Sequence, residues 1–301
     1  MSKRTLLRAV AALSVPLLGA ALASTAAAAP KPKPVVTASP VEYVALGDSY
    51  AAGVGAGSYL DSCYRSLKGY PGLIAAAGGY TLDFQACSGA TVNDVQTKQL
   101  GPLDDETDLV TITVGGNDIG FAATLTTCLG LNTTACLNAV AVANTKINTE
   151  LPGKLDTLFG AVKGQAPNAR VVVTAYPKLF NGKDCSILTS FTSAEMTALN
   201  NGALNLATKV SEAAARADFA YADVVPPFVG HAVCDRSPWI RNAQLFNQFE
   251  SFHPNATGYL SGYKPVVTAK LATAATGGSM TVTTGGITSS DTSRGTVRTL
   301  G

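Results

Sequence analysis

Short apolar runs alternate with longer Ala-rich stretches through the middle of the chain. The short runs are rich in β-branched residues and predict five strands, at residues 43–46, 82–85, 109–114, 170–175 and 219–224. Runs that are apolar at nearly every position, such as 109–114, are typical of strands buried on both faces. The longer stretches predict helices over residues 138–163, 193–216 and 255–272. This alternation predicts an α/β fold, with helices packed on a mostly parallel five-stranded sheet.

The first 29 residues have the pattern of a signal peptide. Lys3, Arg4 and Arg8 give a basic start, an apolar stretch covers residues 9–23, and Ala27–Ala29 forms a small-residue cleavage site. The apolar stretch is shorter than the roughly 20 residues that a membrane-spanning helix needs. The segment therefore predicts secretion rather than a stable membrane anchor.

The rest of the chain divides into three parts. Residues 30–39 form a Pro-rich lead-in, and residues 40–276 contain the strand–helix pattern. Residues 277–301 turn to Gly, Ser and Thr without an apolar period, which predicts a flexible tail. The central part has the length of one sizeable domain.

Charge argues against two classes of partner. Removal of residues 1–29 takes away three basic residues and no acidic one, which changes the formal net charge from +2 to −1. No basic cluster or basic amphipathic helix remains in the rest of the chain. We therefore expect no nucleic-acid partner and no electrostatic attraction to an anionic membrane.

The cysteine content agrees with export. An even number of cysteines in an exported chain predicts disulfides, although the sequence alone leaves their connectivity open; the six are Cys63, Cys87, Cys128, Cys136, Cys185 and Cys234. We expect no metal, because C-x-x-C is absent and the chain has only two histidines, His231 and His253. We also expect no cofactor, because Gly53–Gly57 lacks the G-x-G-x-x-G spacing of a dinucleotide-binding loop.

Polar and glycine-bearing turns follow three of the predicted strands. Gly47–Tyr50 follows the first strand, Cys87–Ala90 the second and Gly115–Asp118 the third, while Phe252–Pro254 precedes the last predicted helix. In a parallel sheet the ligand-binding loops lie at the carboxyl ends of the strands, so these turns are expected at one edge. Each turn also has a structural interpretation, and Ser49 alone fits a helix N-cap equally well.

Together these turns supply the groups that a serine hydrolase needs. A serine nucleophile requires an imidazole to take its proton and hydrogen-bond donors at the developing oxyanion. His253 is the candidate base for Ser49. The donors would be the backbone N–H groups of Ser49 and Gly89 and the side-chain amide of Asn117. His231 is the weaker candidate for the base, because it lies beside a cysteine that we expect in a disulfide.

The four motifs, in this order, resemble the sequence blocks of the SGNH, or GDSL-type, hydrolases. The resemblance covers about residues 41 to 272 and is greatest to the secreted bacterial lipase, phospholipase and esterase branch. It implies a three-layer, flavodoxin-like α/β/α sandwich, with Ser49 as nucleophile and His253 as general base and acid. It also implies an oxyanion hole formed by Ser49, Gly89 and Asn117.

The disulfide pairing is likewise implied by the resemblance, and sequential pairing that closes modest loops is consistent with it. The expected pairs are Cys63–Cys87, Cys128–Cys136 and Cys185–Cys234.

One position departs from the family pattern. The family usually has Asp three residues before the histidine, whereas this chain has Glu250 before Ser251, Phe252 and His253. Glu250 has one more methylene group, and in parts of this branch a backbone carbonyl orients the histidine instead. We favour the Ser251 carbonyl as the partner of His253 Nδ1, and Glu250 stays open as the third catalytic residue.

These observations predict a secreted, monomeric serine esterase or lipase that hydrolyses carboxylic esters of lipids through an acyl-enzyme on Ser49. A phospholipase A-type acyl hydrolase is nearly as well supported, and a carbohydrate acetylesterase is a more distant alternative. A non-catalytic exported binding protein is the alternative from another class. Such a protein would be expected to lack Ser49, Asn117 or His253, and all three are present.

Overall fold

The computed structural model describes residues 40–272. The predicted signal peptide (1–29), the Pro-rich lead-in (30–39) and the tail (277–301) lie outside the described residues. Across residues 40–272, no helix is both long enough and apolar enough to cross a membrane.

The domain is built on one sheet of five strands whose recorded pairings are all parallel. The strand order is β2-β1-β3-β4-β5; the strands are β1 (Glu42–Gly47), β2 (Thr81–Phe84), β3 (Leu109–Thr113), β4 (Arg170–Thr174) and β5 (Ala220–Ala222). The predicted parallel α/β fold is confirmed. Because β2 and β3 lie on opposite sides of β1, the topology switches direction at β1, and ligands bind at such switch points in open α/β sheets.

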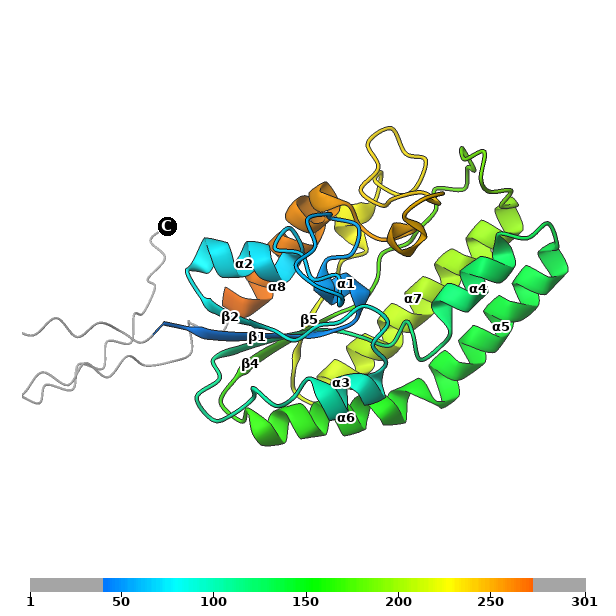
Figure 1. Ribbon diagram of the computed structural model, residues 1–301. Helices are drawn as coiled ribbons and strands as arrows, with labels where there is room; N and C mark the ends of the chain where they lie inside the picture. The colour runs from blue at the N-terminus through cyan, green and yellow to red at the C-terminus, as the bar shows by residue number, and fades with distance from the viewer. Residues whose placement is uncertain (1–39, 273–301) are drawn as a thin grey trace, which may run out of the picture. The chain divides into compact units, whose positions relative to one another are not determined.

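Helices cover both faces of the sheet (Figure 1). One face carries α2 (Tyr70–Gly78) and α8 (Lys264–Ala272), and the other carries α3 (Val92–Lys98), α6 (Leu151–Gln165) and α7 (Ser193–Arg216). Two further helices, α4 (Phe121–Cys128) and α5 (Thr133–Thr149), pack against each other, and α5 packs against α7. The β3 and β4 side chains are almost all buried, as expected for strands covered on both faces.

Two predicted helices are interrupted. The sequence predicts one helix over 138–163, but α5 ends at Thr149 and α6 begins at Leu151. Pro152 lies in the first turn of α6, where its missing N–H has no intrahelical partner to lose, so proline favours a helix start there. Similarly, a π-helical segment, η3 (Gly258–Tyr263), precedes α8. Pro265 cannot donate the backbone hydrogen bond that a regular α-helix would require at that position.

The six cysteines form three disulfides, and these are the pairs that the family resemblance implies: Cys63–Cys87, Cys128–Cys136 and Cys185–Cys234. The first bridge joins the loop after α1 (Ser49–Ala52) to the turn after β2. Next to it, the Ser88 N–H donates to the Cys63 carbonyl at 3.0 Å. The turn that carries Gly89 is therefore covalently attached to a second loop at the same edge of the sheet.

Gly47 gives a direct test of the turn that ends β1. Its φ is +128°, and a Cβ atom there would lie 2.1 Å from the carbonyl oxygen of Thr113 on β3. We expect Gly47→Ala to lower the free energy of unfolding by about 2–5 kcal/mol, through backbone strain and overpacking. The measurement is urea denaturation with the disulfides intact. The matched control is Gly164→Ala, since a Cβ at this exposed position in α6 meets nothing within 4 Å. Equal stability of the two variants would contradict the prediction.

Candidate active site

Ser49 is the first residue of α1, directly after β1, and it is 8 % exposed. Asp48 precedes it as the N-cap, and the Asp48 carboxylate accepts the Tyr50 N–H at 2.9 Å. The hypothesis that Ser49 itself caps the helix is therefore wrong. Gly53, with a φ of +89°, ends α1 after one turn. This short helix leaves the Ser49 hydroxyl at the carboxyl edge of the sheet, beside the topological switch point.

The structure brings Ser49 and His253 together across 204 residues of sequence. The imidazole Nε2 lies 2.7 Å from Ser49 Oγ. Its other nitrogen, Nδ1, lies 3.0 Å from the backbone carbonyl oxygen of Ser251. A carbonyl can only accept, so Nδ1 carries the proton and Nε2 is free to accept the proton of the serine hydroxyl.

His253 is held in its neutral form. Burial lowers the pKa of His253 to about 4, and the neighbouring carbonyls of Ser251 and Glu250 oppose this shift only in part. A general base must be unprotonated before it can take a proton. At neutral pH the imidazole is therefore in the state that the chemistry requires.

The backbone next to His253 is in an unusual conformation. Phe252 has a φ of +61°, which for a residue other than glycine costs roughly 1–3 kcal/mol. Two hydrogen bonds fix Phe252: its carbonyl accepts the Tyr50 hydroxyl at 2.7 Å, and its N–H donates to the Arg241 carbonyl at 3.0 Å. The Arg241 N–H in turn donates to the His253 carbonyl at 2.9 Å. Surrounding contacts thus hold the backbone that aims the imidazole.

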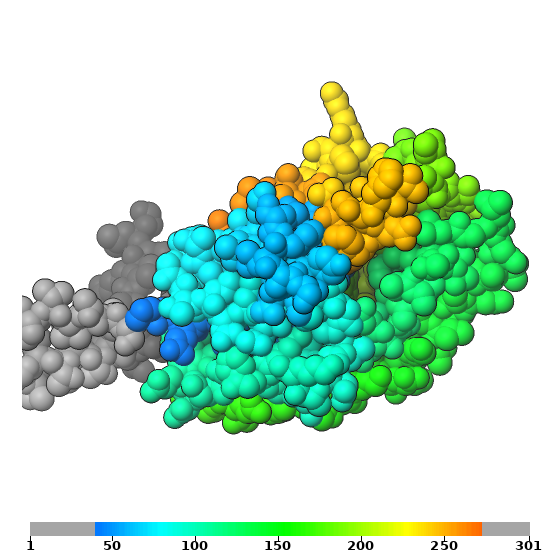
Figure 2. All heavy atoms as spheres, in the orientation of Figure 1, coloured from blue at the N-terminus to red at the C-terminus, as the bar shows by residue number. Residues whose placement is uncertain are grey.

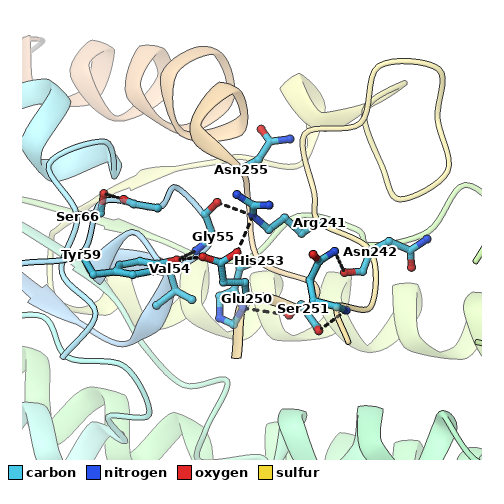
Figure 3. Close-up of polar contacts among 12 residues, drawn as sticks. Val54, Gly55, Tyr59, Ser66, Arg241, Asn242, Glu250, Ser251, His253 and Asn255 are labelled. Carbon is cyan, nitrogen blue, oxygen red and sulfur yellow. Dashed lines mark hydrogen bonds and ion pairs between the residues drawn. The ribbon is translucent and has the colours of Figure 1, made fainter. Parts of the chain in front are cut away.

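The Glu250 carboxylate does not contact the imidazole, because Ser49 and Ser251 take both ring nitrogens. It is buried, with 5 % of the residue exposed. One oxygen accepts the Tyr59 hydroxyl, and the other lies 3.3 Å from Arg241 Nε (Figure 3).

The same cluster continues to the loop after α1. Arg241 Nε donates to the Gly55 carbonyl at 2.6 Å, and the Gly55 N–H donates to the Tyr59 hydroxyl at 3.0 Å (Figure 3). We call Tyr59, Arg241, Glu250 and the Gly55 backbone the clamp. It joins the segment that carries His253 to the loop that follows Ser49.

The glycine-rich loop that superficially resembled a dinucleotide site has a packing role. Gly55 has a φ of +91°, and a Cβ atom there would lie 2.3 Å from the Pro254 carbonyl oxygen and 3.1 Å from the His253 Cβ. Only glycine lets this loop approach the His253 segment so closely.

The proposed oxyanion donors lie on the turns after β2 and β3. Gly89 is exposed, with a φ of +84° and no atom within 4 Å of the position that a Cβ would take. The Asn117 amide donates to the Ala90 carbonyl at 2.9 Å, which places it beside the Gly89 turn. An amide NH₂ has two donors, so the second N–H of Asn117 is left for another acceptor. Asp118 ties the two turns together, because its carboxylate accepts the Val92 N–H at 2.9 Å.

One residue that supports these turns, Tyr176, was not identified from the sequence. The Tyr176 hydroxyl donates to the buried Asp48 carboxylate and accepts the Gly116 N–H at 2.9 Å. Burial raises the pKa of Asp48 to about 7. The turns after β1 and β3 are therefore joined through one tyrosine, which follows β4 at the same edge of the sheet. Its position directly after the predicted strand 170–175 was the available sequence signal.

His231 lies elsewhere. Its ring stacks on Trp239 with the ring centroids 3.6 Å apart, and its Nδ1 lies 2.7 Å from the Ser237 carbonyl oxygen. The structure therefore does not bring His231 to Ser49.

An apolar pocket of about 410 Å³ lies beside His253, between α4 and the segment 243–253. In the space-filling view, a hollow separates the orange segment around residue 250 from the green surface of α4 and α5 (Figure 2). The lining residues are Phe121, Ala122, Leu125, Thr126, Leu129, Leu188, Ala243, Gln244, Leu245, Gln248, Phe249, Ser251, Phe252 and His253. Among residues 40–272, no group of three or more His, Cys, Asp or Glu is arranged to bind a metal ion.

This chain belongs to the GDSL-like Lipase/Acylhydrolase family, whose pattern it matches over residues 45–260. The membership confirms the family resemblance and the predicted class of carboxylic ester hydrolase.

Individual relatives agree with this assignment. Lipase 1 of Streptomyces coelicolor is 46 % identical over 230 residues, which are 75 % of this chain and 85 % of that protein. The crystal structure of an extracellular lipase from Streptomyces rimosus has a TM-score of 0.74 and 42 % identity, covering 76 % of this chain and 99 % of the other. Phospholipase A1 from Streptomyces albidoflavus NA297 also has a TM-score of 0.74, with 41 % identity and coverage of 77 % and 99 %.

The contacts of the clamp lead to a prediction that tests whether Glu250 is a structural or a catalytic residue. We expect Glu250→Gln to lower kcat by about tenfold or less, about 1.4 kcal/mol of barrier, because the Ser251 carbonyl still holds Nδ1. The free energy of unfolding should also fall, because a buried ion pair is broken. Steady-state kinetics on a soluble ester and urea denaturation measure the two effects. A loss approaching 10⁴, as when a triad carboxylate is neutralised, would make Glu250 the third catalytic residue.

The lowered pKa of His253 predicts that kcat/KM is retained to unusually low pH. Protonation removes the base, and burial pushes that protonation to lower pH, so kcat/KM should stay nearly constant from about pH 8 to about pH 5.5. It should fall only as the pH approaches the pKa of about 4. The measurement is kcat/KM for a soluble short-chain ester against pH, with circular dichroism to check folding at each point. A midpoint at or above about 6.5, the ordinary histidine value, would contradict the prediction.

Proposed function

We propose that this protein is a secreted serine esterase that hydrolyses acyl esters of lipids through an acyl-enzyme on Ser49. The observation that carries the proposal is the 2.7 Å contact between Ser49 Oγ and the Nε2 of an imidazole whose Nδ1 proton is held by the Ser251 carbonyl. A hydroxyl and an imidazole in this arrangement form an activated nucleophile.

In the first half of the reaction, Ser49 Oγ attacks the ester carbonyl carbon and its proton passes to His253 Nε2. The carbonyl oxygen becomes an oxyanion that accepts hydrogen bonds from the Ser49 and Gly89 backbone N–H groups and the Asn117 amide. When the tetrahedral intermediate collapses, the C–O bond to the alcohol breaks, and His253 returns the proton to the departing oxygen. The products of this half are the free alcohol and the acyl-enzyme on Ser49.

In the second half, water attacks the acyl carbon while His253 takes one of its protons. Collapse of the second tetrahedral intermediate breaks the bond to Ser49 Oγ, which recovers its proton from His253. The fatty acid leaves and the serine is regenerated. The imidazolium that forms in each half donates through Nδ1 to the Ser251 carbonyl, whose partial negative charge stabilises it without a carboxylate.

The apolar pocket supports lipid acyl chains as substrates. It opens beside His253, and its walls are mostly aliphatic and aromatic, as in sites that bind apolar ligands. A phospholipase A-type activity is the second candidate, because the related Streptomyces albidoflavus structure is a phospholipase A1. Its acyl ester would react by the same steps, with the phosphate as a bystander.

Secretion is supported by the signal-peptide pattern, the three disulfides and the related extracellular lipase of Streptomyces rimosus. A monomeric enzyme is supported because Ser49 and His253 converge within one chain, with the turns that carry Gly89 and Asn117 at the same edge of the sheet. The same convergence speaks against the non-catalytic binding protein.

The nucleophile can be tested directly. We expect a fluorophosphonate probe to label the wild type, and Ser49→Ala to fold normally, resist labelling and lose nearly all activity on a panel of acylglycerols, phospholipids and simple acyl esters. His253→Ala should lose turnover as well, and the matched control His231→Ala should keep it. Substantial activity in folded Ser49→Ala would rule out the acyl-enzyme on this residue. Acetylated polysaccharides complete the panel, and wild-type activity confined to them would rule out the lipid substrate class.

A further inference from the structure

Several large apolar side chains are fully presented to solvent on three loops. Ile187 is 100 % exposed, Phe246 93 % and Leu131 90 %, and Leu245 next to Phe246 is 59 % exposed. Apolar surface scattered as single residues is normal, but a contiguous apolar patch marks an interaction site.

The pocket beside His253 places them around one opening. Leu129, Leu188 and Leu245 are all part of its lining. Each is next to, or two residues from, one of the fully exposed side chains, so the three loops border the same hollow (Figure 2). We call Leu131, Ile187, Leu245 and Phe246 the apolar rim. The loops that carry it border the pocket through which an acyl chain would reach Ser49 and His253.

The three loops carry no charge. Residues 119–145, 185–194 and 242–249 contain no Lys, Arg, Asp or Glu, although charged residues make up 14 % of the chain. Of the charges that flank these ranges, Arg241 pairs with Glu250, and the Asp184 carboxylate accepts the Phe191 N–H at 2.7 Å. A surface of this kind lacks the basic cluster through which proteins bind the headgroups of anionic lipids.

Disulfides hold two of the three loops in the exposed arrangement, and side-chain contacts hold the third. The Cys128–Cys136 disulfide closes the turn that carries Leu131, and Cys185–Cys234 anchors the loop that carries Ile187. On the third, Phe249 stacks on Tyr64 with the ring centroids 4.3 Å apart, and the clamp fixes Glu250. The fold therefore maintains the exposure of the rim.

We propose that the apolar rim docks the enzyme on the surface of uncharged or zwitterionic lipid, with its side chains inserted among the acyl chains. The proposal rests on the proposed function, since the docked surface is the source of the substrate. Insertion of apolar side chains from loops binds in proportion to the apolar area buried. It also presents the pocket entrance directly to the lipid, so that an ester need not cross water to reach Ser49.

Binding is tested in the Ser49→Ala background, so that no lipid is consumed. The probe is phosphatidylcholine vesicles, and co-sedimentation measures the partition coefficient. We expect the additional change Ile187→Ser with Phe246→Ser to weaken binding at least about tenfold, which corresponds to about 1.4 kcal/mol. The matched control is Val229→Ser, which removes an apolar side chain that is 68 % exposed outside the rim and should leave binding unchanged. Raising the salt concentration should have little effect.

Kinetics in the active enzyme separate docking from catalysis. The Ile187→Ser, Phe246→Ser enzyme should keep its kcat/KM on a soluble short-chain ester. Its rate on phosphatidylcholine vesicles or emulsified triacylglycerol should fall about tenfold.

Unchanged vesicle binding in the double variant would overturn the proposal, as would binding that requires anionic lipid and disappears in salt. A wild-type dimer that the double variant converts to monomer would assign the rim to a second copy instead. If the wild type hydrolyses no ester but Ser49→Ala still binds vesicles through the rim, docking stands and the proposed function fails.

Discussion

The arrangement of the site depends on one constraint: His253 must face Ser49 while a backbone carbonyl, rather than a carboxylate, holds its other nitrogen. A carbonyl two residues away can reach Nδ1 only if the chain between them turns sharply. The left-handed conformation of Phe252 provides that turn, at a cost of roughly 1–3 kcal/mol. The contacts from Tyr50 and Arg241 to the Phe252 backbone offset this cost. The residue that follows the nucleophile thus helps to place the base.

The position of Glu250 follows from the same constraint. With the Ser251 carbonyl at Nδ1, a carboxylate at this point of the sequence is not needed at the imidazole, and a buried charge without a partner would be strongly destabilising. The side chain turns instead to the Arg241 guanidinium and the Tyr59 hydroxyl. Buried ion pairs add little net stability but impose a fixed geometry, which is the more useful contribution next to a catalytic base.

Much of the fold and site could be predicted because the patterns that specify them are formed by residues close together in the sequence. Continuous apolar runs define the strands, and the catalytic motifs occupy the turns that follow them. The residues that were missed act through distant partners: Tyr176 contacts Asp48 across 128 positions, and Tyr59 contacts Glu250 across 191. Neither contact has a local pattern, since a tyrosine in a loop is also compatible with simple packing. Pro152 is a local signal for a break in the helix predicted over 138–163. The Ala-rich helical pattern continues on both sides of it, and for that reason a single helix was predicted.

The segment from Arg241 to His253 combines two tasks that make opposite physical demands. Its middle carries Leu245 and Phe246 into solvent, while its end must hold an imidazole 2.7 Å from a hydroxyl. A loop that moved with its surroundings would misplace His253, and errors of about 1 Å are expensive in catalysis. Two clamp residues, Arg241 and Glu250, lie on either side of the exposed Leu245 and Phe246. Their contacts join the segment to the loop after Ser49. The contacts of Arg241 and Glu250 thus attach the segment to the Gly55 and Tyr59 loop on both sides of its exposed tip, and this attachment separates the position of His253 from that of the tip.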